Sequence, residues 1–233
     1  MTGDKKNVSP VTCYDFEVKM RNQNQPVAVE GYPFIILLGF VTLVFALLNW
    51  SLLAVLFLGL TLFCAYFFRN PDRVVPPDEK AVIAPADGKV VFVGEVMEDR
   101  YMKEEMTKVS IFMSVFNVHV NRLPCSGKVL DMFYNKGEFL NASLDKASLQ
   151  NEQAGILLES KTGQRIVFVQ VAGLVARRIV TYPEIGDQVE AGKRYGLIRF
   201  GSRVDVYLPK GTEILASVGD KTSAGETILG YFR

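Results

Sequence analysis

The chain has 233 residues, enough for one or two domains. Its 26 basic and 25 acidic residues leave a net charge near zero, which excludes a protein that binds nucleic acid through bulk charge. Apolar residues make up 49% and charged residues 22%, so the chain is not intrinsically disordered. The charges are unevenly spread, because none falls between Glu30 and Arg69. This pattern indicates a globular domain joined to a membrane-embedded segment.

Residues 1–31 are polar and charge-balanced, and they predict a loose tail rather than a signal peptide. The uncharged run 32–68 would reach about 55 Å as one helix, well beyond the roughly 30 Å hydrocarbon core. Asn49-Trp50-Ser51 interrupts it, which predicts a membrane-embedded helical hairpin with both ends on one side. Whether the hairpin spans the bilayer or enters one leaflet stays open. Arg69 and Arg73 follow directly, so we expect both ends and the following domain on the cytoplasmic side of the cell membrane.

Residues 69–79 contain three prolines and predict a linker. From residue 80 to 233 the chain is rich in β-branched and aromatic residues, punctuated by Gly, Asp and Pro. One stretch, 139–152, has a helical or irregular pattern. The domain is therefore expected to be mostly β, a sandwich or barrel. The strand-like segments are 81–96, 108–123, 164–182, 193–200 and 203–209.

Two segments of this domain are related. Gly186–Gly192 and Gly219–Gly225 both read G-D-x-[V/T]-x-A-G, which favours an Asp-containing turn, a short strand and a Gly turn. This pattern looks like the hairpins of lipoyl and biotinyl domains. We therefore predict a lipoyl/biotinyl-like barrel-sandwich catalytic domain, preceded by the α-helical membrane hairpin.

The cysteines and the histidine limit the chemistry. Cys13, Cys64 and Cys125 are too scattered for a disulfide framework, which fits a reducing compartment. With one histidine and no Cys-x-x-Cys pair, we expect no metal site. By strand alternation, His119 shares a face with Asn117 and Asn121. A lone histidine is more often structural than catalytic.

Asp87 and the pair Gly201-Ser202 are the other candidates. Asp87 precedes a glycine at the start of a strand, where a plain turn aspartate is the simplest interpretation. Gly201-Ser202 lies between two strand-like runs, where a glycine bend is the simplest interpretation. Because glycine lacks Cβ, the Ser202 hydroxyl can approach the preceding carbonyl, and with a base nearby it can attack its own peptide bond. An ester and then chain cleavage would follow.

Taken together, these segments resemble the phosphatidylserine decarboxylase proenzymes of the short bacterial and archaeal type. The resemblance covers nearly everything from Gly31 onward, and its order makes it specific. It rests on Gly31–Phe34, Phe68–Pro71, Ala84–Val90, Phe116–His119, Asn121–Pro124, Phe139–Ala142, Asp145–Ser148 and Gly201–Asp205.

The resemblance implies that the chain cleaves itself between Gly201 and Ser202. The products, 1–201 and 202–233, would stay together as a heterodimer, and a higher oligomer stays open. Ser202 would become a pyruvoyl group, the covalent cofactor, with no separate cofactor, metal or nucleic acid. The pyruvoyl ketone would form a Schiff base with the amine of phosphatidylserine and take up the electron pair left by CO₂, and hydrolysis would release phosphatidylethanolamine.

The resemblance also implies roles for Asp87 and His119 in support of Ser202. Asp87 matches the aspartate of the family. Longer members carry two histidines as H-x-x-H, and here Arg122 stands at the second position, which usually serves self-cleavage. Either His119 therefore serves both steps, or Asp87 or water is the base for cleavage. We expect His119 to protonate the carbanion during decarboxylation.

Two further points concern the lipid and a rival function. Six basic residues could meet anionic headgroups. The rival is a membrane-anchored lipoyl/biotinyl-like carrier or adaptor, because Asp145-Lys146-Ala147 looks like a lipoyl-lysine tripeptide. That lysine lies well before the related G-D segments, which disfavours a carrier, and only the decarboxylase should mature into two chains. The basic residues are Arg69, Arg73, Lys136, Lys146, Arg177 and Arg178.

Overall fold

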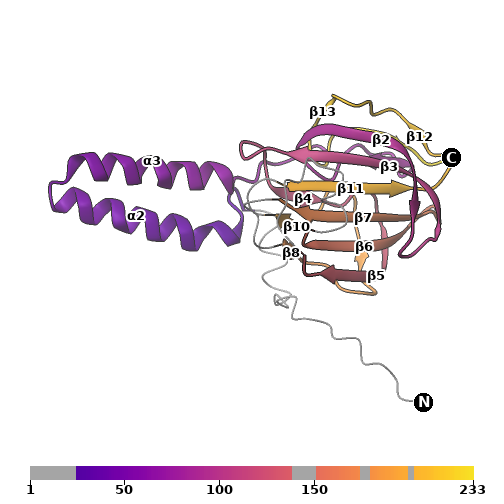
Figure 1. The fold of residues 1–233 in the computed structure, drawn as a ribbon, viewed down its shortest axis with the longest axis horizontal. Helices are drawn as coiled ribbons and strands as arrows, with labels where there is room; N and C mark the ends of the chain where they lie inside the picture. The colour runs from indigo at the N-terminus through magenta and orange to yellow at the C-terminus, as the bar shows by residue number, and fades with distance from the viewer. Residues whose placement is uncertain (1–24, 138–150, 174–178, 199–201) are drawn as a thin grey trace, which may run out of the picture.

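The computed structural model describes residues 25–137, 151–173, 179–198 and 202–233. Two helices project together from one side of a β-domain (Figure 1). Several expectations fall outside the described residues: the segment 139–150, the tail up to residue 24, Gly201, and the basic residues Lys146, Arg177 and Arg178.

The helices α2 (Tyr32–Leu47) and α3 (Ser51–Phe67) form an antiparallel pair within the range expected for a hairpin. A short 3₁₀ turn, η1 (Val29–Gly31), leads into α2. Between the helices, Asn49 has a φ of 60°, a left-handed conformation that asparagine tolerates better than most residues. Most large apolar side chains of the pair are exposed, as at Leu52, where the exposed fraction is 84%. So much apolar surface is unfavourable in water and indicates a surface that meets another phase.

The described residues of the β-domain form three antiparallel sheets. The largest has eight strands in the order β13-β2-β3-β11-β7-β6-β5-β9, and two smaller sheets have the orders β1-β14-β12 and β4-β10-β8. The large sheet is curled, and together the sheets enclose one apolar core. The domain is therefore mostly β, as predicted. The strands are β1 (Ala81–Ile83), β2 (Gly88–Glu98), β3 (Glu104–Met113), β4 (Val120–Arg122), β5 (Gly127–Asn135), β6 (Gln153–Ser160), β7 (Arg165–Ala172), β8 (Ile179–Thr181), β9 (Gln188–Val189), β10 (Arg194–Ile198), β11 (Ser202–Leu208), β12 (Glu213–Ile214), β13 (Lys221–Thr222) and β14 (Ile228–Tyr231).

The sheet orders show an internal duplication. We call β1–β3 with β11–β14 half A, and β4–β10 half B. The large sheet reads the same from both edges when β13, β2, β3 and β11 are matched with β9, β5, β6 and β7, and the small sheets match likewise. Reciprocal hydrogen bonds mark the pseudo-two-fold axis, because Ile83 N donates to Pro124 O and Arg122 N donates to Pro85 O, both at 2.9 Å. Half B is thus inserted in the sequence between β3 and β11 of half A.

The related G-D segments have the same structure in the two halves. Gly186 and Gly219 have φ values of 98° and 105°, which favour glycine. Asp187 accepts from Glu184 N, and Asp220 accepts from Ser217 N, each at 2.8 Å. The two-residue strands β9 and β13 follow and pair with β5 and β2. The predicted succession of turn, short strand and turn is confirmed for both segments.

A separate apolar cluster joins the helices to the β-domain. Phe67 and Phe68, at the end of α3, are buried against half B. Glu30, just before α2, accepts a hydrogen bond from Tyr182 Oη at 2.8 Å. The base of the helix pair is therefore fixed to the domain. The domain residues of this cluster are Val118, Val120, Val180, Tyr182 and Leu197.

The continuous strand expected over 108–123 is wrong, because the chain turns at residues 114–119. Asn117 causes the turn. Its Oδ1 accepts from Ser114 N at 2.8 Å and from Ser114 Oγ at 2.7 Å, while Asn117 N donates to Ser114 O. A local side-chain hydrogen bond of this kind competes with the strand ladder. His119 therefore lies in a loop before β4 and does not share a strand face with Asn117.

Candidate active site

Ser202 is the first residue of β11, near the centre of the eight-stranded sheet. It pairs with Met113 on β3 and with Ala172 on β7. Its side chain is fully buried on the same face as the core residues Val204 and Val206. Among the described residues, its Oγ has no hydrogen-bond partner. A buried hydroxyl without a partner is costly, so it marks a position kept for a reason other than stability.

His119 is fully buried where the helices meet the β-domain. Its ring centroid lies 4.2 Å from that of Phe67 on α3, and its Nδ1 lies 2.9 Å from Asn117 O. The His119 backbone is also hydrogen-bonded to the segment that precedes Ser202. Its carbonyl accepts from Ile198 N at 3.3 Å, and Ile198 precedes Ser202 closely in the chain.

The surroundings of His119 keep its imidazole neutral near pH 7. Burial lowers the pKa of His119 to about 4, the hydrogen bond to Asn117 O opposes this shift, and the positive charge of Arg69 adds to it. A neutral imidazole can accept a proton at neutral pH. This shift could not be predicted from the sequence, because it depends on burial beside α3 in the folded protein.

Asp87 lies between β1 and β2 and is bound by two groups. Arg73 Nη2 donates to both carboxylate oxygens, at 2.8 and 2.9 Å, and Ala224 N donates to Oδ1 at 2.7 Å. Arg73 also pairs with Glu226 at 3.1 Å. Asp87 directly precedes β2, which β3 separates from the strand of Ser202. The described contacts thus join Asp87 to the linker and not to Ser202 or His119.

Arg122 stands at the second-histidine position and has a structural environment. Its Nη1 donates to Gly192 O at 2.8 Å, and its Nη2 donates to Pro71 O at 2.9 Å and to Asn70 Oδ1 at 3.3 Å. Burial lowers the pKa of Arg122, and the neighbouring charge of Arg73 lowers it further. The guanidinium is therefore engaged in holding the linker against half B.

A buried polar network that the sequence did not reveal lies beside Ser202. Gln170 Nε2 donates to Asn121 Oδ1 at 2.8 Å, and Thr181 Oγ1 donates to Gln170 Oε1 at 3.2 Å. Asn121 Nδ2 lies 3.5 Å from the sulfur of Met113, the residue that pairs with Ser202. Only Asn121 could have been noted from the sequence, since the three residues come from strands that meet only in the fold.

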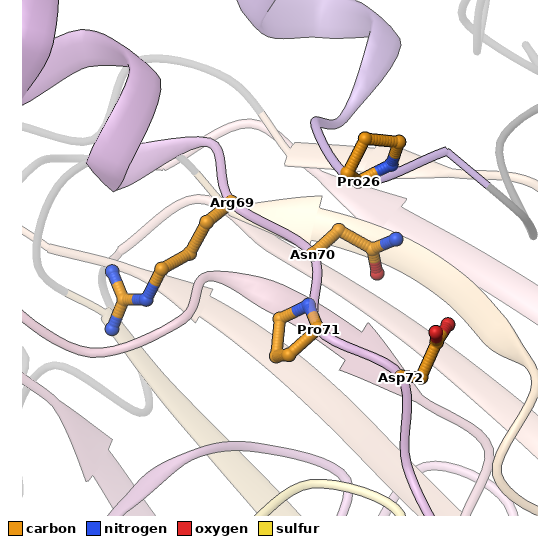
Figure 2. A pocket seen from close by; sticks show the side chains of 5 residues that line it. All are labelled: Pro26, Arg69, Asn70, Pro71 and Asp72. Atoms are coloured by element: carbon orange, nitrogen blue, oxygen red, sulfur yellow. The ribbon is translucent and has the colours of Figure 1, made fainter.

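A pocket of about 330 Å³ opens at the junction of helices and domain. Pro26 and the four residues Arg69–Asp72 line it, and Figure 2 shows the Arg69 side chain extending away from Asn70 and Asp72. Arg69 Nη1 donates to Tyr66 O and its Nη2 to Phe116 O, both at 2.8 Å. The guanidinium has five N–H donors, and those two bonds to described residues leave others that a ligand could accept.

Comparisons with known proteins agree on one family. The family model for phosphatidylserine decarboxylase matches residues 60–230. The chain is 66% identical to the phosphatidylserine decarboxylase proenzyme of Syntrophotalea carbinolica, over 92% of this chain and all of that protein. Proteins of the same name from Geotalea uraniireducens and Geobacter metallireducens are 59% and 58% identical, over 91% of this chain and 99% of each. The similarity that the sequence motifs indicated is confirmed, and the chain belongs to the phosphatidylserine decarboxylase family.

Proposed function

We propose that this chain is a proenzyme that decarboxylates phosphatidylserine to phosphatidylethanolamine after cleaving itself between Gly201 and Ser202. The observation that carries the proposal is the buried Oγ of Ser202, which has no hydrogen-bond partner among the described residues and lies at the start of a central strand in a chain of this family. In cleavage, Oγ adds to the carbonyl carbon of Gly201 and gives its proton to a base. The C–N bond then breaks, and nitrogen takes up a proton, which leaves an ester. A base then removes the Cα proton of residue 202 and the Gly201 carboxylate leaves, which separates 1–201 from 202–233. Water adds to the imine form of the resulting dehydroalanine, and loss of ammonia gives the pyruvoyl ketone.

A pyruvoyl group at residue 202 fits the residues around it. Met113 and Ala172 flank the position, and the core beneath it is apolar. Once formed, the group supplies an electrophilic carbonyl that binds the substrate amine and accepts the electron pair left by CO₂. The described residues contain no group of three His, Cys, Asp or Glu side chains placed to bind a metal. Self-processing within the chain is the source of the cofactor in this proposal.

His119 is proposed to move the proton in decarboxylation. Because its imidazole is neutral at pH 7, it can first accept a proton from the substrate ammonium. It can then return that proton to the carbon from which CO₂ has left. Binding of an anionic headgroup beside Arg69 would offset the charge that lowers the pKa of His119, which favours the protonated form when it is needed.

Asp87 is proposed to support self-cleavage, as the family resemblance implies. Its contacts with Arg73 and Ala224 favour a positioning role over direct attack on the Ser202 proton. In this proposal, Asp87 fixes the linker and the second G-D turn at the start of β2. A neutral His119 or water then takes the hydroxyl proton.

Membrane association is proposed from the helix pair. Val29–Leu47 is long and apolar enough to cross a membrane, whereas Ser51–Phe67 is slightly shorter. Both outer ends lie at the β-domain (Figure 1), and Arg69 and Arg73 follow α3 in the sequence. This arrangement supports a hairpin in the cell membrane with the domain on the cytoplasmic side. An anchored enzyme meets its lipid without extracting it into water, which costs about 0.8 kcal/mol per CH₂.

Arg69 is proposed to bind the substrate headgroup. Arg73 is buried against Asp87 and Glu226, so it is less suited to a ligand. Arg69, by contrast, lines the pocket at the base of the hairpin, close enough to His119 for its charge to act there. Arginine matches phosphate and carboxylate geometry. This pocket would therefore hold the headgroup where the hairpin enters the lipid.

The fold is proposed to be a lipoyl/biotinyl-like barrel sandwich. The duplicated halves and the two matched G-D turns support that classification. The domain boundaries follow the same reasoning: a tail over 1–31, the hairpin over 32–68, the linker over 69–79 and the catalytic domain over 80–233.

The test of the proposed function is an intact-mass measurement on purified protein, combined with CO₂ release from phosphatidylserine. We expect two chains, the smaller one being 202–233 with a pyruvoyl end. A single uncleaved chain without activity would contradict the proposal and would favour the carrier or adaptor.

A further inference from the structure

The duplication allows each position of half B to be compared with its partner in half A. Asn121 and Thr181 flank Gly196 in the sheet β4-β10-β8. In the matching sheet β1-β14-β12, Val82 and Ile214 flank Gly230. The two positions that flank this glycine, which we call the row, are therefore polar in half B and apolar in half A.

The polar row is completed by Gln170, whose side chain covers Gly196. A Cβ at Gly196 would lie 2.2 Å from Val180 O, as one at Gly230 would lie 2.3 Å from Glu213 O, so both rows need the glycine for its backbone neighbour. In half B the Gln170 amide also lies over the glycine, with Nε2 2.9 Å from that Cβ position. Asn121 and Gln170 are fully buried, and the exposed fraction of Thr181 is 7%. Half A shows that the fold forms without polar groups in this row. Because burying them costs free energy, their presence in half B points to a function.

The network ends beside the reacting residue. Gln170 holds Asn121 Oδ1, so Asn121 Nδ2 faces Met113, whose sulfur is only a weak acceptor. Met113 is the cross-strand partner of Ser202, whose Oγ has no partner among the described residues. The Asn121 amide, whose only acceptor there is weak, and the Ser202 hydroxyl therefore both lie next to the flexible side chain of Met113.

We propose that Asn121, held by Gln170 and Thr181, donates a hydrogen bond to Oγ of Ser202 during self-cleavage. A rotation of the Met113 side chain would exchange the sulfur acceptor for the serine oxygen. The bond orients Oγ and stabilises the negative charge that grows on it as its proton leaves for the base. This inference rests on the proposed function, since it assigns Asn121 to the step that makes the mature enzyme.

The test follows the rate of self-cleavage in protein made by cell-free synthesis with detergent micelles. Samples taken over time show conversion of the precursor to 1–201 and 202–233 on a gel. Asn121→Val introduces the side chain that half A has at the matching position, Val82. We expect cleavage to slow about 100-fold or more, the usual loss for a donor to a developing oxyanion. Thr181→Val, which frees one end of Gln170, should slow it less.

Two controls separate this role from a structural one. The melting temperature of Asn121→Val should fall about as much as that of Thr181→Val, because each change leaves one end of the buried Gln170 amide without a partner. Cleavage slowed equally in the two variants would merely follow the melting temperature and would overturn the proposal. Ser160→Ala removes a buried hydroxyl, with its bonds to Thr162 and Gln164, at the far end of β6 and should leave the rate unchanged.

The outcomes distinguish the role of Asn121 from the proposed function. A wild-type chain that cleaves, beside an Asn121→Val chain that cleaves equally fast, overturns the role of Asn121 alone. A wild-type chain that never cleaves overturns the proposed function and this role with it. If Asn121→Val does not fold, Thr181→Val decides: an unchanged rate overturns the proposal, and a rate reduced at least threefold supports it.

Discussion

Asp87 and Ser126 occupy equivalent positions in the two halves of the β-domain. Asp87 accepts the backbone N–H of Ala224 at 2.7 Å, and Ser126 Oγ accepts that of Ala191 at 2.9 Å. Both alanines belong to the related G-D segments. Capping this turn therefore needs only a side-chain oxygen, and the carboxylate of Asp87 has a second purpose, its pair with Arg73.

Replacing Asp87 by serine, the residue of half B, tests that second purpose. Asp87→Ser should keep the cap on Ala224 but leave Arg73 with Glu226 alone. We expect the free energy of unfolding to fall by about 1–3 kcal/mol and the cleaved fraction to fall sharply. Ser126→Ala is the matched control, because it removes a cap without removing a charge, and it should cleave normally. Normal cleavage in Asp87→Ser would show that the carboxylate has no part in maturation.

The apolar helices could be predicted from the sequence because their signal is local, whereas Asp87, His119 and Ser202 became candidates only through the resemblance to the family. A long uncharged run has few stable structures besides a membrane hairpin. The two G-D turns could also be predicted, since glycine and aspartate stabilise such turns through local contacts. The hydrogen-bond partners of Asp87 could not be predicted, because Arg73 and Ala224 come next to it only in the folded domain.

The sequence pattern does not predict β5 and β6, and it predicts one strand over 108–123, where the structure has the end of β3 and then β4. The pairing of β5 with β6 shifts between Val129 and Asp131, and such a bulge breaks the alternation by which a strand is recognised. Conversely, the run 108–123 looks continuous because the Asn117 turn is made by a side chain. The arrangement of His119 relative to α3 therefore could not be predicted.

Removing the Ser202 hydroxyl should abolish both maturation and activity. Ser202→Ala has neither the nucleophile nor the precursor of the pyruvoyl group. We expect a single chain of full mass and no CO₂ from phosphatidylserine. Because Ser202 Oγ makes no hydrogen bond to a described residue, the variant should fold as stably as the wild type. Cleavage at residue 201 in this variant would be incompatible with the proposed chemistry.

His119 should matter more for turnover than for maturation. His119→Ala is expected to yield some cleaved, pyruvoyl-bearing enzyme, because cleavage occurs once and water can serve as a slow base. Turnover should drop about 100-fold or more, as is usual when a general acid–base group is lost. The measurement is CO₂ release per pyruvoyl group, beside the cleaved fraction on a gel. Near-normal turnover per pyruvoyl would exclude His119 as the proton donor, and a complete failure to cleave would make it the indispensable base.

The low pKa of His119 predicts how stability changes with pH. The folded pKa of about 4 lies below the usual 6.5, so between these values the unfolded chain binds more protons. The contribution of His119 to the free energy of unfolding is therefore full above pH 6.5 and is lost as the pH falls toward 4. At pH 5 the loss should amount to about 2 kcal/mol.

Urea unfolding in detergent at several pH values measures this effect. Ser202→Ala is the suitable background, since it remains one chain. Adding His119→Gln should reduce the fall in the free energy of unfolding between pH 7 and 5 by about 2 kcal/mol. Equal slopes with and without the imidazole would mean that His119 titrates near its ordinary value.

Arg69 should govern substrate affinity. Arg69→Ala removes the charged group at the base of the hairpin, and we expect KM for phosphatidylserine in mixed micelles to rise about tenfold, because a charged hydrogen bond is worth about 1.5–3 kcal/mol. The cleaved fraction should stay normal and kcat should change little. Arg69→Lys keeps the charge and should recover part of the loss. A fall in kcat at constant KM would instead assign Arg69 to the chemistry.

The insertion of half B within half A determines the order in which the enzyme can be made. A cut before Ser202 divides half A between two polypeptides and leaves half B in one. Strand β11 then belongs to the short polypeptide, yet it pairs with β3 along one edge and β7 along the other. Alone, that polypeptide would present two open strand edges and an apolar face, the conditions for aggregation. Folding must therefore come before cutting, and the two polypeptides, if synthesised apart, should not assemble into the active enzyme.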